Sequence, residues 1–176
     1  MDKTSNPLHA LAELLSGRAL PIVAPERLAP SAFYDLRYRM SVIAAAFEIH
    51  AKPYGFGQRR VHAGRLKLLQ FVACRPWLIG MMREWSAAQY DAQLSIASSQ
   101  RLRRGFLGDQ MHEDVVAFLV ARGVLAKMGS HIVSVNANFL TDLYAVSLEQ
   151  ALFSSERRAL HELLDVQITN SMLEGW

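Results

Sequence analysis

The sequence predicts a mainly helical protein of the α+β class, in which a helical N-lobe is followed by a winged-helix module with one short β-hairpin. Residues 109–143 give the main signal, because they read as a helix, a tight hairpin and the start of a second helix. A second observation is that residues 32–50, 61–74 and 77–89 each carry apolar residues at helical spacing. We expect four parts, at residues 1–30, 31–89, 90–108 and 109–176.

The N-terminal part, residues 1–30, is expected to be a docking helix followed by a proline-rich connector. Residues 1–17 carry an apolar stripe that includes Leu8, Leu11 and Leu15. Three prolines within 18–30 indicate an extended chain. A short amphipathic helix on such a tether can bind another subunit, and the alternative is that it packs on its own domain.

The helical lobe, residues 31–89, is predicted to have long helices at 32–50 and 61–74 and a third at 77–89. The glycine-containing stretch 51–60 between the first two is expected to be a loop. Tyr54 and Phe56 in this loop could contact a partner or nucleic acid, but we expect them to pack into the core. Trp77 and Trp85 lie at helical spacing, which is typical of a core and also of a protein-binding face.

The basic linker, residues 90–108, leads into the winged-helix lobe, residues 109–176. Asp109 is the expected N-cap of the first helix, and Gly123 follows its last turn, where glycine adopts left-handed backbone. Strands are expected at 124–127 and 131–135, with a turn at 128–130. Helices follow from Phe139 and over 154–173, and the terminal Trp176 could anchor in a partner's groove.

Positive charge is concentrated in residues 1–105, which hold 15 Lys and Arg against 7 Asp and Glu, whereas residues 106–176 hold 4 against 9. Such a division suits a protein that contacts an anion on one side and a basic partner on the other. The alternative is a chance asymmetry of solvated charges. If the linker folds back on the 61–74 helix, a phosphate-facing patch would contain Arg59, Arg60, Arg65, Lys67, Arg101, Arg103 and Arg104.

Nothing in the sequence indicates an enzyme, a metal site or a cofactor. His112, Glu113 and Asp114 are consecutive on a helix and point about 100° apart, so they cannot converge on one metal ion. The sequence has no Walker loop, dinucleotide fingerprint or Gly-x-Ser-x-Gly elbow. The single cysteine, Cys74, fits a reducing cytoplasm. We expect neither a signal peptide nor a membrane-spanning segment.

Three stretches resemble a known family: GRLKLLQFVACRPWLI at 64–79, RLRRGF at 101–106 and VVAFLVARGVLAKMGSHIVSVNANF at 115–139. Together they look like the middle component of bacterial ABC three-component anti-phage defence systems, including the small subunit of Lamassu-type complexes. The resemblance covers about residues 61–150. It implies a non-catalytic subunit that binds the head of an SMC/Rad50-like ATPase and holds a nuclease-type effector inactive until foreign DNA is sensed.

Two functions follow as hypotheses. The first is an accessory subunit that bridges the ATPase and the effector, with its basic region near double-stranded DNA. The second is a stand-alone winged-helix DNA-binding transcriptional regulator, which would dimerise and bind DNA without partners. The acidic helix that precedes the expected hairpin argues against insertion of this module into a major groove.

Overall fold

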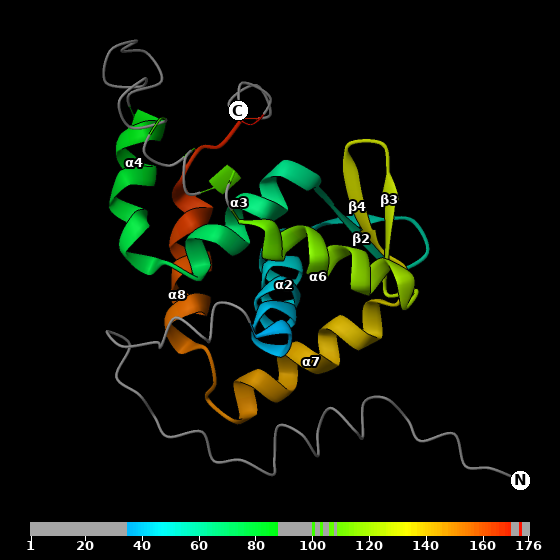
Figure 1. The fold of residues 1–176 in the computed structure, drawn as a ribbon. Coiled ribbons are helices and arrows are strands. Elements are labelled where there is room, and N and C mark those ends of the chain that lie inside the picture. The colour runs from blue at the N-terminus through cyan, green and yellow to red at the C-terminus, as the bar shows by residue number, and fades with distance from the viewer. Residues whose placement is uncertain are drawn as a thin grey trace, which may run out of the picture.

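The computed structural model of the chain describes residues 35–87, 100, 103, 106, 107, 109–169 and 173. This part is mainly helical and contains one four-stranded antiparallel sheet of order β1-β2-β4-β3, so the predicted α+β class is confirmed (Figure 1). The elements run in the order α2 (Leu36–His50), β1 (Lys52–Tyr54), β2 (Gln58–His62), α3 (Ala63–Ala73), η3 (Pro76–Leu78), α4 (Ile79–Ala87), α6 (Gln110–Ala121), β3 (Leu125–Met128), β4 (His131–Ser134), α7 (Ala137–Glu149), α8 (Ser154–Glu162) and η5 (Leu163–Asp165).

The predicted order of helix, hairpin and helix is confirmed in α6, β3, β4 and α7. Gly123 follows α6 with a φ of +68°, and Gly129 closes the turn between β3 and β4 with a φ of +59°. Glycine accepts this left-handed backbone without the steric cost that a side chain would bring. The Asn136 side chain caps α7, since its Oδ1 accepts a hydrogen bond of 3.1 Å from the Phe139 amide.

A second hairpin lies where we predicted a loop over 51–60 and a helix starting at Val61. Here the prediction is wrong, because β1 and β2 pair with each other and α3 begins only at Ala63. β2 also pairs with β4, with Val61 opposite Ile132. The sheet therefore contains two hairpins rather than the single one predicted, and the second joins the first through a pairing distant in sequence.

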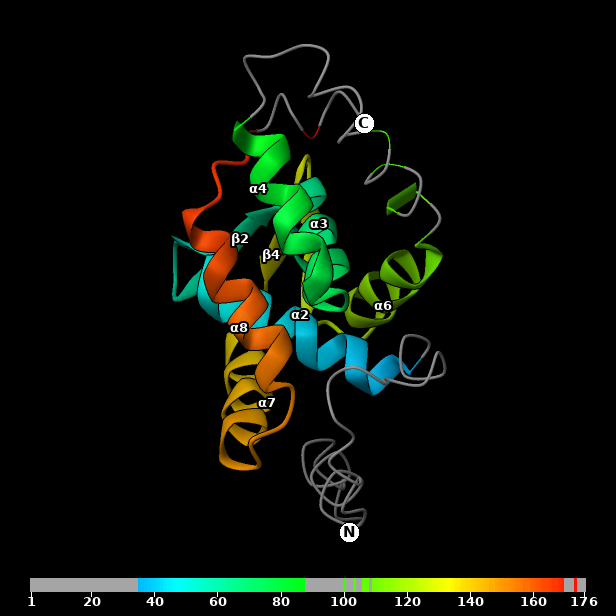
Figure 2. The same cartoon turned by 90° about the vertical axis from the view of Figure 1, so that its left-hand side faces the viewer.

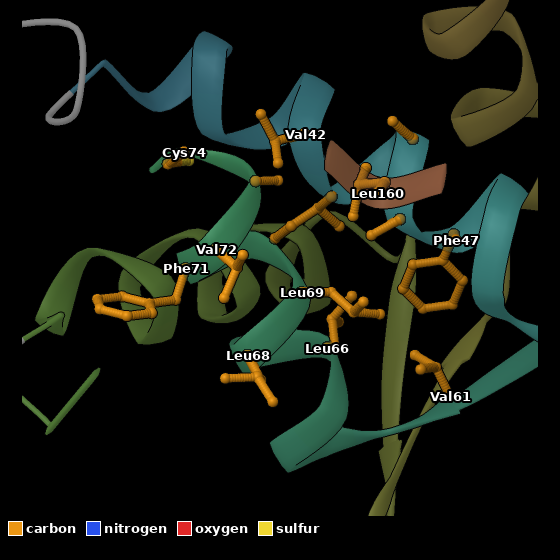
Figure 3. Packing of buried hydrophobic residues seen from close by; sticks show 14 of the residues in the cluster. Val42, Phe47, Val61, Leu66, Leu68, Leu69, Phe71, Val72, Cys74 and Leu160 are labelled. Atoms are coloured by element: carbon orange, nitrogen blue, oxygen red, sulfur yellow. The ribbon is translucent and has the colours of Figure 1, made fainter. Parts of the chain in front are cut away.

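Helix α2 is the centre of the molecule, and α3, α6, α7 and α8 pack around it (Figure 1). Every residue from Tyr38 to Phe47 is buried, so α2 has no solvated face over this length. Figure 3 shows Phe47 of α2, Leu69 of α3, Leu160 of α8 and Val61 of β2 in one cluster. A helix that is buried all round depends on packing with its neighbours rather than on its own propensity.

The predicted division into a helical lobe and a winged-helix lobe does not divide the core. One hydrophobic cluster includes α2 and α3 from the first segment and α6, α7 and α8 from the second. β2 and β4 likewise bring the two segments into one sheet. Figure 2 shows α4 and α8 on the side of the molecule turned away from the sheet.

Other helix boundaries also differ from the predictions. The helix expected over 32–50 begins only at Leu36, with Asp35 as its N-cap, and the helix expected from Phe139 begins at Ala137. Within the described residues, the helix expected over 154–173 ends at Glu162 and is followed by the short 3₁₀ turn η5. The helix expected from residue 77 begins as the 3₁₀ turn η3, and α4 starts at Ile79. The expected docking helix at 1–17, the connector at 18–30 and nearly all of the 90–108 linker lie outside the described residues.

Candidate functional site

The two faces of the sheet carry different side chains. Alternate residues of a strand point to opposite faces, and Val61, Leu125 and Ile132 point into the hydrophobic core. We call the opposite face the outer face, and the strand register identifies the residues that lie on it. Its members are Lys52, Tyr54, Gln58, Arg60, His62, Ala126, Met128, His131 and Val133.

Positive charge on the outer face is not neutralised within the sheet. Lys52 of β1 stands directly opposite Arg60 of β2, and both side chains are exposed. The four strands contain no Asp or Glu, and neither residue forms an ion pair within the described part of the chain. Like charges at directly opposed positions destabilise a strand pair. An anion bound between them would remove this repulsion.

Aromatic rings lie on both sides of that cation pair. The Arg60 guanidinium is 5.0 Å from the centre of the Tyr54 ring. Two residues further along β2, His62 faces His131 of β4, and their ring centres are 5.6 Å apart in an edge-to-face arrangement. The Nδ1 atom of His62 is buried without a hydrogen-bond partner. Tyr54, Arg60 and His131 also line a hollow on this face, together with Met128.

Phe56, at the tip of the β1–β2 hairpin, is the most exposed large apolar residue described. It is 107% exposed relative to an unfolded reference, so our expectation that it packs into the core is wrong. Its φ is +53°, a left-handed conformation that costs a side-chain-bearing residue about 1–2 kcal/mol. Gly55 and Gly57 flank it, and no neighbouring atom would meet a side chain at either position. The hairpin thus holds an aromatic ring in solvent at a cost in backbone energy.

Three of the other predicted phosphate-binding residues, Arg59, Lys67 and Arg65, lie away from the outer face. Arg59 points to the core side, where its Nη1 donates to Glu48 Oε2 at 2.6 Å. Lys67 pairs with Glu113 at 3.2 Å and lies over the Phe106 ring.

Arg65 is partly buried and its Nη1 is 3.4 Å from the Ile168 carbonyl oxygen; burial lowers the pKa of its guanidinium. Of the predicted residues that the structure describes, only Arg60 therefore belongs to the outer face. Arg103 is exposed, and Arg101 and Arg104 lie outside the described residues.

The predicted partner-binding residues also separate. Trp77, in η3, is 66% exposed, whereas Trp85 is 3% exposed and belongs to the core. Trp85 therefore packs the fold rather than presenting a surface. The apolar stripe of Leu8, Leu11 and Leu15 and the terminal Trp176 lie outside the described residues.

A buried polar cluster joins α2, α3 and the start of α6. The Arg39 guanidinium donates two hydrogen bonds to the Asp109 carboxylate, at 3.0 and 3.1 Å, and Arg75 donates a third at 3.2 Å. Asp109 therefore does not cap α6 with its side chain as predicted, because its oxygens are used by these guanidinium groups. Gln70 Nε2 donates to the Arg39 carbonyl oxygen at 3.1 Å. His112 Nδ1 donates to Gln70 Oε1.

Apart from the ion pair of Arg39 and Asp109, burial favours the neutral form of four interior groups, which belong to His112, His50, Cys74 and Tyr38. Burial lowers the pKa of His112 to about 4 and that of His50 to about 4. Burial raises the pKa of the Cys74 thiol to about 11, so it is not a reactive thiolate at neutral pH. Burial also raises the pKa of Tyr38, whose hydroxyl donates to Glu156 Oε1 at 2.8 Å. His50 Nε2 lies 2.8 Å from the Leu160 carbonyl oxygen, and the partners of His112 and Tyr38 are likewise interior groups, as is usual for structural contacts.

His112, Glu113 and Asp114 diverge on α6. His112 is buried, Glu113 pairs with Lys67, and Asp114 is exposed. Within the described ranges, no three His, Cys, Asp or Glu residues gather closely enough to hold a metal ion.

Sequence reasoning missed Lys52, His62 and His131 as members of a common face. One signal was present in the sequence, since no Asp or Glu occurs between Ile49 and Arg83. It does not reveal that β2 pairs with β4, which is what brings His62 beside His131.

The fold and this face together define an α+β protein with an unneutralised basic and aromatic sheet surface. Comparisons of the chain with family models, with curated proteins and with solved structures found no match. Among the described residues, no helix is both long enough and apolar enough to cross a membrane.

Proposed function

We propose that the chain is a non-catalytic accessory subunit of an SMC/Rad50-like ATPase complex in cytoplasmic antiviral defence, where it bridges the ATPase and a nuclease-type effector and contacts DNA. The observation that carries the DNA contact is the outer face of the sheet. Lys52 and Arg60 are directly opposed and exposed there, and the strands hold no carboxylate to neutralise them. The family resemblance of residues 61–150 supplies the identity of the partners.

The distribution of acidic residues supports the bridging part of the proposal. Asp142 and Glu149 are exposed on α7, and Asp165 is exposed in η5. α8, which precedes η5, lies on the side of the molecule turned away from the sheet (Figure 2). The exposed carboxylates of α7 and η5 can attract a basic protein surface, while the cations of the sheet attract an anion. The exposed Trp77 of η3, which packs beside α8, adds an aromatic anchor of the kind that protein interfaces favour.

The arrangement of α6 favours this role over a stand-alone regulator. In a winged-helix regulator, a helix of the module enters the major groove, so its surface must tolerate phosphates. α6 exposes Glu113 and Asp114, which would be repelled by DNA. Contact through the outer face of the sheet avoids these carboxylates.

Affinity purification from the native host tests the proposal. The tagged wild-type chain is expected to recover a large SMC- or Rad50-like ATPase and a nuclease, identified by mass spectrometry. Recovery of the chain alone, or with genomic DNA only, would contradict the bridging role and favour the stand-alone regulator.

Direct DNA binding is tested with purified protein and a double charge reversal, Lys52→Glu with Arg60→Glu. If both side chains contact phosphates, the slope of log K against log salt for duplex DNA should become shallower by about 2. Arg83→Glu with Arg158→Glu is the matched control, because it changes the charge equally and both arginines are exposed, on α4 and α8, which lie on the side turned away from the sheet. Equal salt dependence in wild type and the double variant would contradict the DNA contact.

A further inference from the structure

We propose that the outer face binds single-stranded rather than duplex DNA, with bases stacked on the aromatic rings and phosphates held by the paired cations. This inference rests on the DNA contact of the proposed function and specifies its ligand. It depends on the order of rings and charges across β1, β2 and β4, which the strand register sets.

The groups alternate along the length of the sheet. Phe56 lies at the hairpin tip, and Tyr54 follows it, opposite Gln58. Lys52 and Arg60 form the next row across the sheet, and His62 and His131 form the row after that. A strand rises about 3.4 Å per residue, so the rows from Tyr54 to the histidines cover about 14 Å. Over this distance the face presents a ring, then a pair of cations, then a second set of rings. The rings can stack on the bases of a few successive nucleotides, and the cations can bind the phosphates between them.

The aromatic groups favour a ligand whose bases are accessible. In a duplex the faces of the bases are already stacked on one another, whereas a single strand offers them to a protein ring. The Phe56 side chain is fully solvated and contacts nothing in its own core, so it is available for stacking. Its left-handed backbone gives up stability to hold the ring in that position.

The cations complete a site of this kind. Proteins that bind single strands without base preference combine a positive track for the backbone with aromatic platforms for the bases. Lys52 and Arg60 provide the charge, and neither is bound to a carboxylate within the described residues. Arg60 also lies over the Tyr54 ring, so the phosphate-binding group and a stacking surface are adjacent. A duplex held by the same face would contact the cations but leave Phe56 without a partner.

The test compares a labelled oligothymidylate of about 12 nucleotides with a mixed-sequence duplex of the same length, by fluorescence anisotropy with the full chain. Wild type is expected to bind the single strand more tightly than the duplex. Phe56→Gly is expected to weaken single-strand binding about tenfold and leave duplex binding unchanged, because only the stacking ring is lost. Glycine accepts the backbone conformation at this position, so the variant should fold.

Two further variants serve as controls for the two types of contact. Trp77→Ala removes another exposed aromatic side chain, located on η3, and should leave single-strand affinity unchanged. Arg60→Gln should weaken binding of both ligands and reduce the salt dependence by about one phosphate contact. An unchanged circular dichroism spectrum, with a melting temperature no lower than that of wild type, would establish in each variant that the effects are on binding.

The outcomes separate this inference from the proposed function. If the duplex binds as tightly as the single strand and Phe56→Gly has no effect, the single-strand inference is wrong while the DNA contact stands. If neither oligonucleotide binds, both are wrong. A selective loss of single-strand affinity in Phe56→Gly, with Trp77→Ala at wild-type affinity, supports the inference.

Discussion

Replacing Asp109 by Asn should destabilise the protein strongly, because this carboxylate joins three helical segments. It accepts two hydrogen bonds from Arg39 and one from Arg75, at 3.0 to 3.2 Å, and the Arg39 and Asp109 side chains are 1% and 3% exposed. Asn at this position removes the negative charge and turns an NH₂ group toward a guanidinium donor. Removing one partner of a buried ion pair costs about 3–5 kcal/mol, since the remaining charge stays in a low-dielectric interior.

Urea unfolding followed by far-UV circular dichroism measures this loss. For a domain of this size, a loss of about 4 kcal/mol with an m-value of about 2 kcal/mol/M lowers the unfolding midpoint by about 2 M. Asp114→Asn is the matched control, because Asp114 is exposed on the same helix, and its free energy of unfolding should change by less than about 0.5 kcal/mol. If both variants unfolded at the same urea concentration, the account of Asp109 as a buried ionic anchor would be refuted.

Three other predictions concern stability. Because burial lowers the pKa of His112 to about 4, the unfolded chain binds more protons than the folded one below the ordinary histidine pKa. The free energy of unfolding should therefore fall as pH decreases from about 6.5 to about 4. In urea titrations at several pH values, His112→Gln should make this dependence on pH weaker. An unchanged dependence would contradict the lowered pKa of His112. Leu66→Ala should lower the free energy of unfolding by about 2–5 kcal/mol, because the Leu66 side chain of α3 is fully buried in the core. Thermal or urea unfolding measures this loss. Phe56→Gly should raise the free energy of unfolding by about 1 kcal/mol through relief of the left-handed backbone, and a decrease would show that Phe56 packs against the fold.

Local signals in the sequence were sufficient where the structure depends on local geometry. The turn at Gly129 and the glycine that ends α6 are positions where left-handed backbone is needed, and Asn136 is a cap whose bond spans three residues. The sequence therefore determined the helix–hairpin–helix order and the α+β class. It also determined the apolar content of α2, although not that almost every side of that helix is covered.

Only the tertiary structure decided the second hairpin and the face that it completes. Residues 58–62 are too short a strand to be distinguished locally from the first turn of a helix, and their strand conformation is stabilised by pairing with β4. Contacts between residues far apart in the sequence also determined which basic side chains are free to bind a ligand. Arg59, Arg60, Arg65 and Lys67 are close in sequence, but Glu48, the Ile168 carbonyl and Glu113 engage three of them, which leaves Arg60 on the outer face. A charged side chain is available to a ligand only if the fold leaves it exposed and without an acceptor of its own, and that depends on contacts between residues far apart in the chain.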